Sequence, residues 1–168
     1  MTNSGATQLG VSLRCARMTA ATRVPARALL SAFLEDDAHY RASASGYGDG
    51  GLPALERALN LFLAHPEIGF VWIAQAAADD VVGCCVACFA ISTSRGAIVV
   101  KLDDVTIRDG WRGRGVGGAM IDALARHLRA DGVGRIDTAC HRENTDAWRF
   151  YERLGFRPLD EERLALML

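Results

Sequence analysis

The stretch KLDDVTIRDGWRGRGVGG, residues 101–118, decides how the rest of the chain is arranged. Its pattern predicts a buried strand, a sharp turn and the start of a helix, because glycine has no Cβ to clash in a tight turn or beside a ligand. Apolar residues then recur at spacings of three and four, which is typical of an amphipathic helix. A helix start has unpaired N–H groups and a partial positive charge, and Arg112 and Arg114 lie beside it. We therefore expect a phosphate site, with a pyrophosphate as its ligand.

Three glycine motifs could account for this stretch. The phosphate loop of nucleoside triphosphatases needs Lys-Ser or Lys-Thr after its second glycine, and Val116 and Gly117 stand there instead. The dinucleotide fingerprint G-x-G-x-x-G is present at Gly113, Gly115 and Gly118 and would indicate an oxidoreductase that uses nicotinamide or flavin. That fingerprint opens the first βαβ unit of a parallel sheet, and too little chain follows it here to build one.

The third motif is supported by a second block of sequence. Residues 112–117, RGRGVG, match R/Q-x-x-G-x-G/A, and residues 144–156, NTDAWRFYERLGF, match N-x-x-A-x-x-F/L-Y-x-x-x-G-F. In this order and separation, the blocks resemble the coenzyme A pyrophosphate loop and the closing motif of the GNAT superfamily of N-acetyltransferases. Together they span about residues 98–158, somewhat over a third of the chain. The resemblance implies an enzyme that uses acetyl-CoA.

Composition places the chain among globular proteins with no strong charge bias. It has 168 residues with a net charge of −1, and we expect a single domain over residues 1–168. The charge balance does not favour nucleic acid or an anionic membrane as a partner. No apolar run approaches 18 residues, so we expect no membrane span. Residues 1–10 are small and polar, lack the layout of a signal peptide, and are expected to form a flexible tail.

The five cysteines are expected to be reduced and to bind no metal. They stand mainly in apolar, strand-like runs and are odd in number, which predicts buried free thiols in a reducing compartment such as the cytoplasm. Cys85 and Cys88 have the spacing of half a zinc site or of a redox pair. No second pair accompanies them and no histidine lies at ligand spacing, so core cysteines are the favoured interpretation.

The order of elements predicts an α/β (α+β) fold. We expect a mixed, mostly antiparallel, twisted sheet of about seven strands with helices on both faces. Residues 43–53, SASGYGDGGLP, are expected to form a loop that acts either as a lid or as a plain connector. The GNAT fold has the same order, and in it two central parallel strands splay apart around the pantetheine arm. The predicted strands are 11–18, 70–76, 81–92, 97–107, 135–140, 156–158 and 163–168; the predicted helices are 24–40, 52–64, 116–130 and 145–155.

The resemblance also implies which residues hold acetyl-CoA. The strand backbone would take the pantetheine arm and the acetyl carbonyl, and the loop amides would take the pyrophosphate. The motif asparagine commonly contacts the cofactor arm, and it could equally cap the helix that follows. The expected cofactor-binding residues are Val105, Thr106, Ile107, Arg112, Gly113, Arg114, Gly115, Val116, Gly117, Gly118, Asn144 and Tyr151.

Three residues are candidates for catalysis. Tyr151 stands where many family members use a tyrosine as the general acid, and its alternative role is part of a buried helix stripe. Asp103 and Asp104 lie in an otherwise apolar strand, where buried charge needs a reason. The stretch resembles that of small-amine acetyltransferases, in which the first acidic residue is the base, directly or through water, and the second holds a cationic substrate. The other interpretation is an ion pair with an arginine such as Arg108.

These observations predict an acetyl-CoA-dependent N-acetyltransferase that acts by direct attack in a ternary complex. The expected acceptor is a small primary amine, such as a polyamine-like amine, an aminoglycoside or an amino acid. Thr106 stands where the family often has an aromatic residue, which puts polyamine specificity in doubt. A covalent route through Cys140 is not favoured, because the pattern places it in the core. A protein lysine or N-terminus as acceptor, and a non-catalytic acyl-CoA sensor, are the alternatives, and a homodimer is common in the family.

Overall fold

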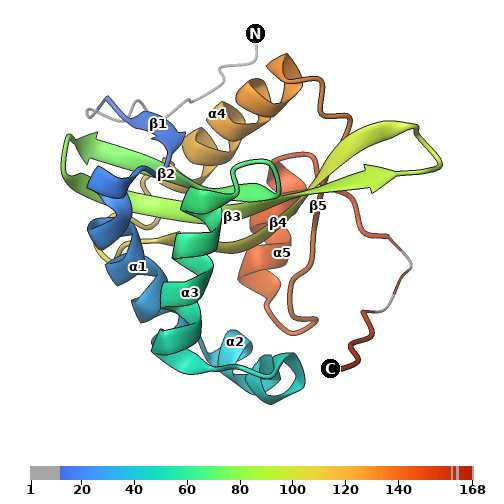
Figure 1. Ribbon diagram of the computed structural model, residues 1–168, viewed down its shortest axis with the longest axis horizontal. Helices are drawn as coiled ribbons and strands as arrows, with labels where there is room; N and C mark the ends of the chain where they lie inside the picture. Colours follow the sequence, from blue (N-terminus) through green and yellow to red (C-terminus); the bar gives the residue numbers. More distant parts are fainter. Residues whose placement is uncertain (1–11, 160, 162, 168) are drawn as a thin grey trace, which may run out of the picture.

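The computed structural model describes residues 12–159, 161 and 163–167, which form one mixed sheet with helices on both sides (Figure 1). The strands lie in chain order, with antiparallel neighbours except for the parallel pair β4 and β5. This order excludes the parallel sheet that a dinucleotide fold requires. The strands are β1 Arg14–Arg17, β2 Gly69–Ala77, β3 Asp80–Ser92, β4 Ala97–Ile107 and β5 Ile136–Thr138. The helices are α1 Arg23–Asp36, α2 Ala38–Ser43, α3 Gly51–Ala64, α4 Val116–Ala130 and α5 Thr145–Arg153, with 3₁₀ turns η1 Ala20–Thr22 and η2 Ala44–Tyr47.

Two hydrophobic cores, one on each face, hold the helices to the sheet. The first joins α4 and α5 to the face of β2, β3 and β4 that carries Trp72 and Leu102. The second joins α1 and α3 to the opposite face, around Leu30, Leu59 and Ile73. Successive strand side chains point to opposite faces, so β3 contributes to both cores. The expected helices on both faces are therefore confirmed.

The prediction of about seven strands is corrected to five in the described residues. In residues 156–159, 161 and 163–167, where a closing hairpin was predicted, no strand forms. Leu164 in this segment is 96% exposed, so its alternating pattern is not matched by a buried face. β5 is consequently an edge strand in the described sheet. The tail predicted at residues 1–10 lies outside the described residues.

The first predicted helix is two helices. Its periodicity continues to Tyr40, but Asp37 adopts an extended backbone, and its side chain accepts a hydrogen bond from the Tyr40 amide at 2.7 Å. Asp37 thus caps α2, which starts in a new direction. The expected loop at residues 43–53 contains η2 and the first turn of α3. No helix in the described ranges is long and apolar enough to cross a membrane.

Candidate active site

The site is built around a bulge in β4. Asp103 pairs with Val86 of β3 and Thr106 pairs with Cys84, so two residues of β4, one of them Asp104, lie opposite a single residue of β3. Asp104 has a φ of 50°, and it is the only non-glycine residue with positive φ in the described part of the chain. Such a bulge bends its strand and redirects its side chains.

β4 and β5 are paired over a short distance only. Their register runs from Val100 with Ile136 to Leu102 with Thr138, and β4 then continues to Ile107 without a partner on that side. Val105 therefore borders the cavity instead of a paired strand, while the Ile107 carbonyl accepts a hydrogen bond from Arg112. This is the separation of the two parallel strands that the family resemblance implies.

The loop after β4 brings helix amides to the same end of the sheet. Gly110, Gly113 and Gly115 have φ values of 78°, 71° and 82°, and a Cβ at any of them would meet nothing within 4 Å. Glycine is thus needed there for its left-handed backbone and not for lack of space. Gly115 is the N-cap residue of α4, and because it has no side chain it makes no side-chain hydrogen bond to the amides of the first turn. A Cβ on Gly117 would lie 3.1 Å from Phe150 of α5, so this glycine permits close helix packing.

The arginines of the loop differ in their availability to a phosphate. Arg112 donates from Nε to the Ile107 carbonyl at 3.0 Å and lies 3.4 Å from Asp109. The Arg114 guanidinium lies 5.7 Å from the centre of the Trp111 ring and has no ion pair with a described residue. Its charge is therefore free to attract a phosphate, while Arg112 supports the strand end.

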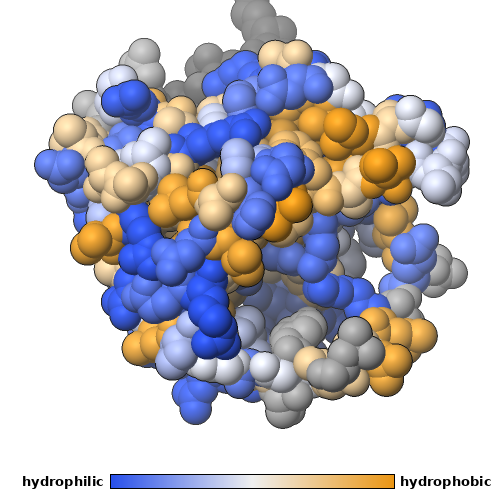
Figure 2. Space-filling model, viewed as in Figure 1, coloured by the Kyte–Doolittle hydropathy of each residue, from blue (hydrophilic) through white to orange (hydrophobic). Residues whose placement is uncertain are grey.

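A cavity of about 1680 Å³ runs along the separated ends of β4 and β5. Its walls come from α1, α2, β4, β5, α4, α5 and the segment after α5. The space-filling view shows the surface hollowed beneath the β3–β4 hairpin, towards α2 (Figure 2). Such a volume exceeds that of an ordinary small-molecule pocket and can admit two substrates together. Val105, on the β4 edge that β5 leaves, lines this cavity, whereas the glycine loop and the first turn of α4 do not line it.

The two aspartates of β4 line this cavity in different states. Asp103 is paired with Lys101, Nζ to Oδ2 at 2.6 Å. Asp104 has no hydrogen bond or ion pair with any described residue, and burial, then the Asp103 charge, raise its pKa to about 6, against the opposing effect of Lys101. The expected pairing with Arg108 is not found, because Arg108 bonds Asp80 at 2.6 Å. Asp104 is thus a buried carboxylate of the cavity that has no partner among the described residues.

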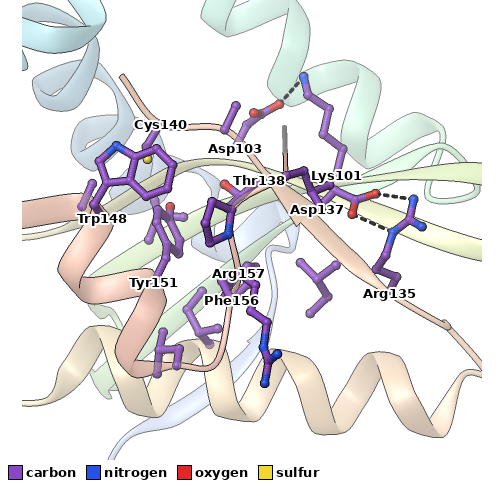
Figure 3. A pocket seen from close by; sticks show the side chains of 18 of the residues that line it. Lys101, Asp103, Arg135, Asp137, Thr138, Cys140, Trp148, Tyr151, Phe156 and Arg157 are labelled. Carbon is purple, nitrogen blue, oxygen red and sulfur yellow. Dashed lines mark hydrogen bonds and ion pairs between the residues drawn. The ribbon is translucent and has the colours of Figure 1, made fainter. Parts of the chain in front are cut away.

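Tyr151 lies on α5 and faces the cavity beside Cys140 and Trp148 (Figure 3). The side chain is only 9% exposed, and its ring meets the rings of Phe150 and Phe156 edge to face. Burial raises its pKa to about 12, partly opposed by the Thr138 hydroxyl. The phenol is therefore protonated at neutral pH. Tyr151 thus belongs to the core and also borders the cavity, and its role as the general acid stays a prediction.

Asn144 caps a helix and also borders the cavity. The Asn144 side chain accepts a hydrogen bond from the Ala147 amide at 3.0 Å and so caps α5, while the residue also lines the cavity.

Cys140 lines the cavity too and is half-buried rather than central in the core; burial raises the pKa of its thiol. Cys85 and Cys88 lie in the cores on opposite faces of β3, so they cannot share a metal ion. Among the described residues, no group of three or more metal-ligand side chains exists.

Some residues of the cavity were not predicted from the sequence. Phe33, Asp37, His39 and Tyr40 of the α1–α2 region form one wall, and the His39 ring lies 5.3 Å from that of His141. The signal that could have found this wall is Asp37 as a helix cap, which separates α2 from α1. The partnership of Lys101 with Asp103 was also missed, although their i, i+2 spacing on one strand is a signal that could have found it.

Comparisons with known proteins agree with this geometry. The sequence profile described as the acetyltransferase (GNAT) family matches residues 26–156, most of the chain. A solved transcriptional regulator from Bacillus halodurans C-125 is 20% identical, with a TM-score of 0.73, over 94% of this chain and 100% of that one. The ribosomal-protein-alanine N-acetyltransferase from Brucella melitensis biovar Abortus 2308 is 15% identical, with a TM-score of 0.71, over 94% and 99%.

A third solved structure contains part of the expected donor. AAC(6')-Iy, in complex with a bisubstrate analogue of coenzyme A and acetylneamine, is 19% identical, with a TM-score of 0.67, over 94% of this chain and 99% of that one. At these low sequence identities, the similarity of the solved structures shows a shared fold and does not show a shared substrate. The profile match over most of the sequence carries the assignment, and the chain belongs to the acetyltransferase (GNAT) family, whose acyl donor is acetyl-CoA.

Proposed function

We propose that this enzyme transfers an acetyl group to the primary amine of a small molecule, by direct attack in a ternary complex. One observation carries the proposal: the unpartnered carboxylate of Asp104 and the protonated phenol of Tyr151 border the same cavity, where β4 leaves β5. A base and an acid at one place are the two proton-transfer groups that amine acetylation needs.

The donor would be held by main-chain groups and by Arg114. The amides of residues 112–118 would bind the pyrophosphate, and the β4 backbone from Val105 to Ile107 would pair with the pantetheine arm. The Asn144 side-chain amide still has N–H groups to donate, because only its oxygen is used in the cap. Bound acetyl-CoA supplies the acetyl group as a thioester, whose sulfur leaves as a thiolate.

Asp104 is the better base of the two aspartates. Its pKa of about 6 leaves it ionised at neutral pH while making it a stronger base than an ordinary aspartate. Asp103, the first residue expected for this role, is held by Lys101. Asp104 would take the ammonium proton directly or through one water. Tyr151 would donate its proton to the leaving sulfur, since a phenol that is protonated at neutral pH can serve as an acid.

The acceptor class is proposed from the shape of the site. The cavity is walled by α1, α2 and the segment after α5, which suits a small amine more than a protein chain. The similarity to AAC(6')-Iy, solved with an acetylneamine conjugate, is in line with a small-molecule amine. The Brucella relative, named for a ribosomal-protein alanine, keeps a protein N-terminus as the second candidate. Five free thiols among the described residues support a reducing, cytoplasmic setting, and a homodimer stays a prediction that light scattering can test.

The test is thiol release from acetyl-CoA with a panel of polyamines, aminoglycosides, amino acids and a lysine peptide. With the preferred amine, Tyr151→Phe should lower kcat by about 10²-fold or more, since general acid catalysis contributes on this order. Asp104→Asn should lower kcat/KM similarly, while Asp79→Asn, in the exposed β2–β3 turn, is the matched control. Binding of coenzyme A without turnover on any amine would favour a sensing module, and equal rates for Tyr151→Phe and wild type would remove the acid role.

A further inference from the structure

Lys101 is the only lysine in the sequence. The other 18 of the 19 lysine and arginine residues are arginines. It lies on β4, two residues before Asp103, and both side chains border the cavity. Residues at i and i+2 of a strand point to the same face, and on this face Lys101 lies opposite Cys88 of β3, next to the α1–α3 core. The single lysine of the chain is thus placed beside Asp103, and its charge also acts on Asp104, the candidate base.

The lysine ammonium is held by a carboxylate of the site. Nζ of Lys101 lies 2.6 Å from Oδ2 of Asp103, and the side chains are 47% and 25% exposed (Figure 3). Asp137, on the neighbouring strand β5, is held in the same way by two bonds from Arg135, at 2.7 and 2.9 Å. Of these three strand carboxylates, only that of Asp104 remains for an incoming cation.

An ammonium on Lys101 is chemically the same group as a protonated primary amine of a substrate. Asp103, the carboxylate that a second substrate ammonium would seek, therefore already has a partner. A dication whose first nitrogen sits beside Asp104 would bring its second charge close to Lys101, and like charges at such an interface disfavour binding. A substrate with one ammonium would meet no such repulsion.

We propose that Lys101 is a specificity-determining residue that admits acceptors with a single ammonium, the reacting one, and disfavours diamines and aminoglycosides. The inference rests on the proposed function and narrows its substrate class. Lys101 acts by occupying Asp103, so removal of its charge opens a second cation subsite. Lysine suits this role because its ammonium is a compact point charge on a flexible stem.

The first test compares two acceptors of matched skeleton, hexylamine with one ammonium and 1,6-diaminohexane with two. Lys101→Gln removes the charge at similar length, and Lys101→Arg keeps it. We expect Lys101→Gln to raise the dication-to-monocation ratio of kcat/KM by at least about fivefold, the effect of roughly 1 kcal/mol from a half-exposed pair. Lys101→Arg should leave the ratio unchanged. An unchanged ratio in Lys101→Gln, or an equal rise in Lys101→Arg, would overturn the inference, and a gain in activity cannot come from a damaged fold.

A second measurement separates this inference from the proposed function. Protein labelled with ¹³C only at the lysine ε-carbon gives one side-chain NMR signal, that of Lys101. Asp103→Asn should shift this signal, and Asp79→Asn should not. If Asp103→Asn leaves the signal in place, no ion pair exists in solution and the inference fails, even in an active enzyme. If the ion pair is present but no amine is acetylated, the proposed function fails instead.

Discussion

Asp104 stores an electrostatic cost in the folded protein, and this makes its stability depend on pH. Burial raises its pKa from 3.8 to about 6. As pH rises from about 4 to 6, the unfolded chain loses this proton first, so the free energy of unfolding falls and then stays low above pH 6. Asp104→Asn removes the charge, and asparagine tolerates the positive φ of 50° at this position. We expect the variant to be more stable at pH 7, by up to about 3 kcal/mol.

Urea unfolding at several pH values measures this effect. The stability gain of Asp104→Asn should be full at pH 7, shrink as pH falls from about 6 to 4, and vanish below about pH 3, where Asp104 is protonated in both the folded and the unfolded chain. The same residue should give wild-type kcat/KM an acidic limb near pH 6, which the variant lacks. A full gain that persists at about pH 3 would mean that packing, not charge, separates the two proteins.

At the scale of elements, the loop before α4 should trade stability for donor binding. Gly115 has a φ of 82° with open space at its Cβ, so Gly115→Ala strains the backbone without a clash. Gly132, after α4, has a φ of 79° and equally open space, which makes Gly132→Ala a matched control. Both variants should lose about 1 to 2 kcal/mol of stability. Only Gly115→Ala should also weaken coenzyme A binding in calorimetry, because it turns the α4 amides away; equal affinities would show that these amides do not bind the pyrophosphate.

The sequence predicts elements best where one face is buried along the whole length. The bounds of β4 and α4 follow from their apolar periodicity, and both are confirmed at residues 97–107 and 116–130. The α1–α2 break was missed because the periodicity continues across Asp37, which caps the second helix. The bulge at Asp104 could not be predicted, because it is defined by the register with β3 and the amino-acid pattern of β4 does not indicate it.

For the whole molecule, local motifs predict which residues meet but not how they are partnered. Asp104 and Tyr151 border one cavity, but the glycine loop at residues 112–118 is not among the residues that line it, so the role of that loop in binding the donor stays a prediction. The pairing of Asp103 with Lys101 depends on side-chain positions, and the cavity wall from α2 depends on tertiary packing. The closing strands at residues 156–158 and 163–168 were predicted from alternation alone. Alternation is the same whether or not a partner strand is present, and none is found there among the described residues.

Whether the two cores unfold as a single domain can be measured through adjacent thiols. Cys84 and Cys85 are buried on opposite faces of β3, one in each core, and burial raises the pKa of both. Neither should react with N-ethylmaleimide until its own core opens. We expect equal protection of the two thiols across a urea series, located by tandem mass spectrometry, because one sheet joins both cores. Half-buried Cys140 should react earlier, by local opening. Earlier labelling of Cys84 than Cys85 would mean that the α1–α3 layer detaches first and that the chain is not one cooperative unit.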